Sequence, residues 1–164
     1  MNRDELTSLF RKLGAPDPEG WARSQLEEGI PQLARFLFLR QAWRRIADER
    51  DASWIDRSIQ RAESHPNEPY AGVGHALKKL RARGATDEEL TDLARGMQAR
   101  ALFSFCYLLD DPGDLEDEVA DMGWTLMQVD DAGNLLATIH GLHESVLATD
   151  PTGREMRPRQ RGGG

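Results

Sequence analysis

Apolar residues recur three and four positions apart along most of the first 110 residues of the chain. This spacing places them on one face of an α-helix. The first such run contains Leu6, Leu9, Phe10 and Leu13. Six stretches follow the pattern, and they cover residues 2–13, 17–28, 31–50, 53–62, 69–83 and 86–109. The sequence therefore predicts about six helices.

Capping residues support the predicted starts and ends of several helices. Asn2 with Glu5, and Thr86 with Glu89, have the spacing of a capping box, in which two side chains satisfy the free N–H groups of a first helical turn. Gly84 follows the fifth stretch at the position where a helix commonly ends. These residues set the helix boundaries independently of the apolar pattern.

The stretch 86–109 changes character after Arg100. Residues 101–109, with the sequence ALFSFCYLL, are apolar on all sides rather than on one face. A helix that is apolar all round is typically buried all round. We therefore expect 86–109 to be a buried central helix with the others packed around it. On the 31–50 helix, by contrast, we expect Arg35 to remain in water.

The chain changes from a helical to a strand pattern beyond residue 110. Residues 124–129 and 135–140 read as strands, and the residues between them, DDAGN, are typical of a tight turn. This predicts a β-hairpin over 123–140, whereas 142–148 could be a strand or a helical turn. The fold class we predict is therefore α+β and predominantly helical. We expect one domain over residues 1–150 and a flexible, basic and glycine-rich tail over 151–164.

Charge narrows the classes of function. The formal net charge is −7, and residues 101–164 hold 12 acidic against 4 basic side chains, so the last third carries the excess. This balance opposes direct nucleic-acid binding, which needs a basic surface. The longest apolar run, 101–109, is far shorter than the ~20 residues of a membrane span, and the first residues lack the features of a secretory signal. We expect a cytoplasmic protein that binds no membrane.

The strongest candidate for a binding surface is an acidic connector after the 86–109 helix. Nine acids and no basic residue lie between positions 110 and 131. Such a surface attracts basic partners. The partner-binding residues that we predict are Asp110, Asp111, Asp114, Glu116, Asp117, Glu118 and Asp121. The first hypothesis is thus a non-enzymatic protein-interaction module, such as an inhibitor or immunity-type partner of a basic protein. The alternative interpretation is a solvated loop that keeps the chain soluble.

His140, His143 and Glu144 form an alternative polar site. On a helix these residues would share one face, whereas on a strand the two histidines would point to opposite faces. Their order does not match the zinc-protease motifs. A small metal-dependent enzyme or metal binder centred on them is the second hypothesis, although the sequence assigns no metal ligand set and no cofactor.

No complete catalytic motif is present, so the sequence identifies no catalytic residue. Cys106 is the only cysteine, which excludes an intramolecular disulfide. Its apolar neighbours favour a small core residue over a reactive thiol. A third hypothesis is a homo-oligomeric regulatory or scaffold domain, but the pattern does not predict an oligomeric state.

Overall fold

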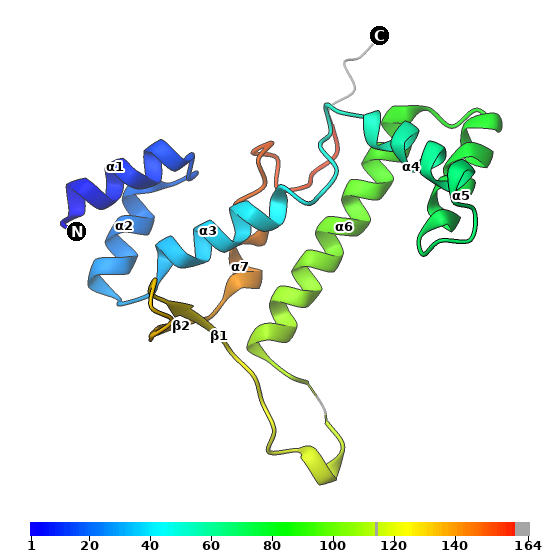
Figure 1. The fold of residues 1–164 in the computed structure, drawn as a ribbon. Coiled ribbons are helices and arrows are strands. Elements are labelled where there is room, and N and C mark those ends of the chain that lie inside the picture. The colour runs from blue at the N-terminus through cyan, green and yellow to red at the C-terminus, as the bar shows by residue number, and fades with distance from the viewer. Residues whose placement is uncertain (114, 160–164) are drawn as a thin grey trace. The chain divides into compact units, whose positions relative to one another are not determined.

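The structure, a computed structural model, describes residues 1–113 and 115–159. It has the predicted α+β fold, which is predominantly helical with a two-stranded antiparallel hairpin near the C-terminus (Figure 1). The elements are α1 (Arg3–Leu13), α2 (Pro18–Glu27), α3 (Gln32–Trp43), α4 (Ser53–Ser64), α5 (Ala71–Ala82), α6 (Asp87–Asp110), a short 3₁₀ turn (Asp117–Val119), β1 (Leu126–Val129), β2 (Leu135–Ile139) and α7 (Leu142–Val146).

The chain divides into two compact units. The first contains Met1–Trp43 together with the described residues from Ala101 onwards, and the second contains Arg44–Arg100. Helix α6 contributes its first part to the second unit and its last part to the first. The single domain over residues 1–150 therefore remains a prediction, and each unit is described by itself.

The core of the first unit begins with helices α1, α2 and α3. The predicted capping box is present, because Glu5 N donates to Asn2 Oδ1 at 3.0 Å and Asn2 N donates to Glu5 Oε2 at 2.9 Å. Behind it, the rings of Phe10, Trp21 and Phe36 meet edge to face, with centroids 5.3–6.0 Å apart. Such aromatic pairs add to the free energy gained by removing the rings from water.

Helix α7 packs against α3 and settles the conformation that the sequence left open for 142–148. Leu142 and Val146 are fully buried. The indole Nε1 of Trp43 donates to the carbonyl of Val146 at 3.1 Å and to Thr149 Oγ1 at 3.2 Å. The segment is thus helical at Leu142–Val146, and a buried indole N–H with two acceptors fixes it to the end of α3.

The second unit is built on close packing of α4 against α5. Gly74 allows this approach, because a Cβ atom at that position would lie 2.1 Å from the backbone oxygen of Ser58. Ile55, Leu77 and Leu90 form the buried core of this unit.

The exposure of the last turns of α6 differs from the prediction. Of residues 101–109 only Cys106 is buried, and Phe105 is 66% exposed. The expectation that this helix is buried on all sides is therefore wrong for this part of it. Helices α1–α3 bury their apolar faces against one another, and α4 packs with α5, so the described chain covers these turns only in part.

The predicted hairpin is confirmed. Strands β1 and β2 pair antiparallel, with Leu126 opposite Ile139, and a register irregularity lies at Gln128 and Val129. Farther along, Asp150 is buried and its carboxylate accepts hydrogen bonds from Thr152 and from the backbone N–H of Met156. The flexible tail predicted for 151–164 remains a prediction, and its residues 160–164 lie outside the described residues. No helix in the described chain is both long enough and apolar enough to cross a membrane.

Candidate functional site

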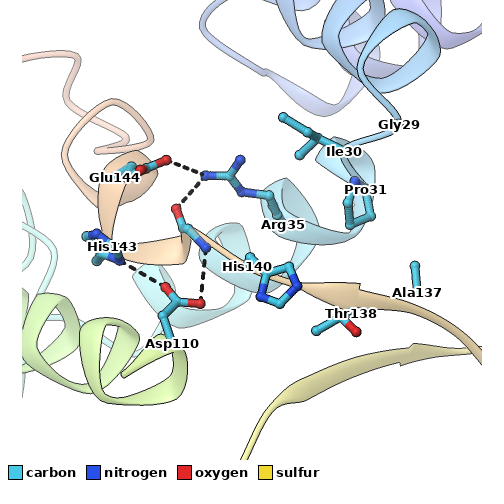
Figure 2. A pocket seen from close by; sticks show the side chains of 11 residues that line it. Gly29, Ile30, Pro31, Arg35, Asp110, Ala137, Thr138, His140, His143 and Glu144 are labelled. Atoms are coloured by element: carbon cyan, nitrogen blue, oxygen red, sulfur yellow. Dashed lines mark hydrogen bonds and ion pairs between the residues drawn. The ribbon is translucent and has the colours of Figure 1, made fainter. Parts of the chain in front are cut away.

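A pocket of about 560 Å³ opens in the first unit where five parts of the chain meet (Figure 2). The connection between α2 and α3 forms one wall, β2 forms another, and the segment around α7 forms a third. Arg35 of α3 and Asp110, the last residue of α6, also line it. The remaining lining residues are Gly29, Ile30, Pro31, Ala137, Thr138, His140, Gly141, His143 and Glu144.

Gly141 shapes this pocket through its backbone. It caps α7 with a φ angle of +64°, in the left-handed region that glycine adopts most readily. A Cβ atom there would lie 2.9 Å from Glu144 Oε2 and 3.0 Å from Arg35 Nη2. Any other residue would therefore combine backbone strain with crowding of two charged groups at the pocket.

Asp110 joins the end of α6 to the start of α7. Its Oδ1 accepts from the backbone N–H of Gly141 at 3.1 Å, and its Oδ2 lies 2.9 Å from Nδ1 of His143. The His143 ring also meets the rings of Tyr107 and Phe103 edge to face, with centroids 5.0 and 6.0 Å away. His143 is thus held by a carboxylate on one side and by two aromatic rings of α6 on the other.

Arg35 is the buried cation of the pocket, with only 5% of its surface exposed. Its Nη2 donates to the carbonyl of Gly141 and, at 3.0 Å, to Ser145 Oγ. Glu144 Oε2 lies 3.6 Å from the same nitrogen. Burial lowers the pKa of Arg35, and the negative charges of Glu144 and Asp110 oppose that shift.

The structure brings the alternative polar site together, but not as a metal centre. His140, His143 and Glu144 all line the pocket, although only His143 and Glu144 belong to α7. His140 precedes that helix, so the three do not share one helical face. No group of three or more His, Cys, Asp or Glu side chains that could hold a metal occurs among residues 1–113 and 115–159.

Arg35 is the pocket residue that sequence reasoning missed. The expectation that it remains in water is wrong, because residues of α7 and the preceding turn cover it. Its position in α3 gave one signal, since Arg35 lies four residues before the buried Leu39 and eight before the buried Trp43, on the same helical face. The pattern of α3 alone could not identify the covering segment, which lies 106 residues farther along the chain.

The acidic connector is mostly exposed, which fits both a binding surface and the alternative of a solvated loop. Glu116, Asp117, Glu118 and Asp121 are exposed, and their side chains form no hydrogen bond or ion pair with any described residue. Asp111 is also exposed, and its carboxylate accepts from the backbone N–H of Gly113 at 2.9 Å. We call these five residues the acidic segment. Asp114 lies outside the described residues, and Asp110 differs from the others because it turns into the pocket.

Exposed apolar side chains flank the acidic segment in the first unit. Phe105, Tyr107 and Leu108 lie before it on α6, and Met122 and Trp124 follow it. The indole Nε1 of Trp124 donates to the carbonyl of Leu108, which brings Trp124 to the end of α6. The Tyr107 hydroxyl lies 3.4 Å from Asp111 Oδ2. We call these five side chains the apolar flank.

The chain was compared with models of protein families, with curated proteins and with solved structures. None of the three comparisons finds a match.

Proposed function

We propose that this protein is an interaction module that binds a partner with a basic surface through the acidic segment. The observation that carries this proposal is that Glu116, Asp117, Glu118 and Asp121 are exposed without a cationic partner in the described chain. Neighbouring carboxylates repel each other because all are negatively charged, and a basic partner would relieve that repulsion. They also increase the rate of encounter with such a partner, by roughly 10–10³-fold at low salt.

The apolar flank supports the same proposal. Charged groups in contact with water contribute more to the rate and specificity of association than to affinity. Affinity usually comes from aromatic and other large apolar side chains that lose their water on binding. Tyr107 lies close to Asp111 and Trp124 bonds to the carbonyl of Leu108, so aromatic and acidic groups are available on neighbouring parts of one unit.

An inhibitor or immunity-type partner of a basic protein is the most concrete form of this function. Such a protein needs a surface that covers the basic region of its target and no reaction of its own. A metal-dependent activity at His140, His143 and Glu144 draws no support from their arrangement. The homo-oligomeric alternative remains a prediction, which light scattering of the purified chain would test.

The test compares two charge-matched double variants. Glu116→Gln/Glu118→Gln removes two unpaired carboxylates from the acidic segment. Asp4→Asn/Asp131→Asn removes two exposed carboxylates outside the acidic segment, and neither of these has a side-chain partner among the described residues. Each protein is immobilised and used to capture partners from lysate of its own source. The captured protein is identified, purified and titrated against all three forms.

We expect the first double variant to bind the purified partner at least about fivefold more weakly at 50 mM salt. The Asp4/Asp131 variant should bind like the unmodified chain. Equal weakening by both variants would show a general charge effect and would contradict a binding surface at the acidic segment. A captured partner with no basic surface would contradict the proposal as well.

A further inference from the structure

Arg35 has hydrogen-bond donors that the protein does not use. A guanidinium carries five N–H donors on three nitrogens. Every hydrogen bond and ion pair of Arg35 with a described residue involves Nη2. Its Nε is completely buried and has no hydrogen-bond partner, and its Nη1 also has no partner among the described residues but is not completely buried, so Nη1 is the donor that a ligand can reach. A cation that is removed from water and left with unpaired donors is energetically costly, so its surroundings normally supply an acceptor.

The carboxylates near Arg35 do not supply that acceptor. Both oxygens of Asp110 are already engaged, by the N–H of Gly141 and by His143. The side chain of Glu144 is 68% exposed, and its nearer oxygen is 3.6 Å from Nη2, beyond ordinary hydrogen-bond length. Figure 2 shows Glu144 reaching Arg35 from one side only, while Ile30 and Pro31 lie on the opposite side of the guanidinium.

The rest of the pocket fits the body of a small organic molecule. Ile30, Pro31 and Ala137 provide an apolar wall. In Figure 2 the ring of His140 lies between Asp110 and Thr138, below Arg35. A volume of about 560 Å³ falls within the ~300–1,000 Å³ of small-molecule sites, which combine apolar walls with a few polar groups.

We propose that this pocket binds a small organic anion, with its anionic group against the unpaired Nη1 of Arg35 and its apolar body against Ile30, Pro31 and Ala137. His140 is the second polar contact for the anionic group. Glu144 opposes binding, because its carboxylate is a negative charge at the same guanidinium. This site is independent of the acidic segment and differs from the metal centre considered for His140, His143 and Glu144.

The proposal is tested with benzoate, phenyl phosphate and neutral benzamide, whose rings have the same size. Each compound is titrated into the ¹⁵N-labelled full chain, and amide resonances are followed by NMR. We expect benzoate or phenyl phosphate to shift the resonances of Gly141 and Ser145 in a saturable manner, and benzamide to bind at least about tenfold more weakly. The anion that binds with the higher affinity shows whether the site prefers a carboxylate or a phosphate.

Three variants assign the effect to Arg35. Arg35→Lys keeps the charge but shortens the reach, and it should weaken binding of the preferred anion by about tenfold or more. Glu144→Gln removes the opposing charge and should strengthen binding by several-fold. Arg40→Lys changes an arginine on the same helix outside the pocket and should have no effect.

Several outcomes would overturn the proposal. One is the absence of saturable shifts at Gly141 and Ser145 with both anions up to 20 mM. Another is equal affinity for benzamide and the preferred anion. If Arg35→Lys fails to fold, the Glu144→Gln variant alone decides. Anion binding by this variant that is no stronger than binding by the unmodified chain would contradict the role of Arg35.

Discussion

Asp110 and His143 are in direct contact, with Oδ2 and Nδ1 2.9 Å apart, although 33 residues separate them along the chain. The second oxygen of Asp110 bonds to the backbone of Gly141, so one carboxylate holds the start of α7 at two points. The acidic segment and the hairpin both lie between these two residues. Asp110 therefore joins the end of α6 to the start of α7 and so brings together the two ends of the segment between them.

Replacing Asp110 by Asn should destabilise the first unit. The amide could still accept from Gly141, but the hydrogen bond of a carboxylate to His143 would be lost in a partly buried site. We expect a loss of about 1–3 kcal/mol in the free energy of unfolding, measured by urea denaturation. Asp131→Asn removes the same charge from an exposed turn and should change stability by less than about 0.5 kcal/mol. Similar values for the two variants would contradict this role.

Two glycines of α5 make a matched pair. At Gly74 an added methyl group would collide with the backbone of Ser58, whereas at Gly72 it would meet no atom within 4 Å. We expect Gly74→Ala to destabilise the protein by about 1–3 kcal/mol, because the backbone of α4 must move. Gly72→Ala should be neutral or slightly stabilising, since alanine favours the helix. Thermal unfolding followed by circular dichroism would compare them, and equal effects would rule out close packing at Gly74.

Cys106 should be an unreactive thiol. Burial raises its pKa to about 11, and the nearby charge of Asp110 acts in the same direction. Since the thiolate is the reactive form, very little of it is present at pH 8. We expect a thiol reagent such as 5,5′-dithiobis(2-nitrobenzoate) to label the native chain slowly and the urea-unfolded chain rapidly. Rapid labelling of the native chain would contradict both the burial and the raised pKa.

The hairpin turn should respond to acid through Asp130. Hydrogen bonds from the side chain and the backbone of Asn134, together with backbone bonds within the turn, lower the pKa of Asp130. A carboxyl with a lowered pKa stabilises the folded turn above its unfolded pKa, and this contribution is lost as the pH falls through the folded pKa. Asn134→Ala should therefore raise the pKa of Asp130, which NMR titration of its side chain would measure. An unchanged pKa would show that the backbone donors alone cause the shift.

Local features of this fold were predictable from the sequence. The capping pair Asn2 and Glu5 and the turn between Asp130 and Asn134 depend on residues a few positions apart. Local hydrogen bonds and backbone preferences determine such features, so a single sequence reveals them.

The candidate site was only partly predictable. His143 and Glu144 were identified from their residue types, and Asp110 was included for its charge. The burial of Arg35 and the exposure of Phe105 depend instead on which distant segment covers each helix, and apolar periodicity does not contain that information. The buried cation at the pocket therefore emerged only from the structure.

The division of the first unit into two stretches affects the order of events during synthesis. The ribosome completes Arg44–Arg100, a continuous unit, before it makes α7. The aromatic cluster of Phe10, Trp21 and Phe36 needs only residues that have already emerged. Arg35 and Trp43, however, obtain their hydrogen-bond acceptors only when Gly141–Thr149 follows. In a nascent chain halted near residue 140, the face of α3 that carries Arg35 and Trp43 would therefore remain uncovered, and chaperones bind such transiently exposed surfaces.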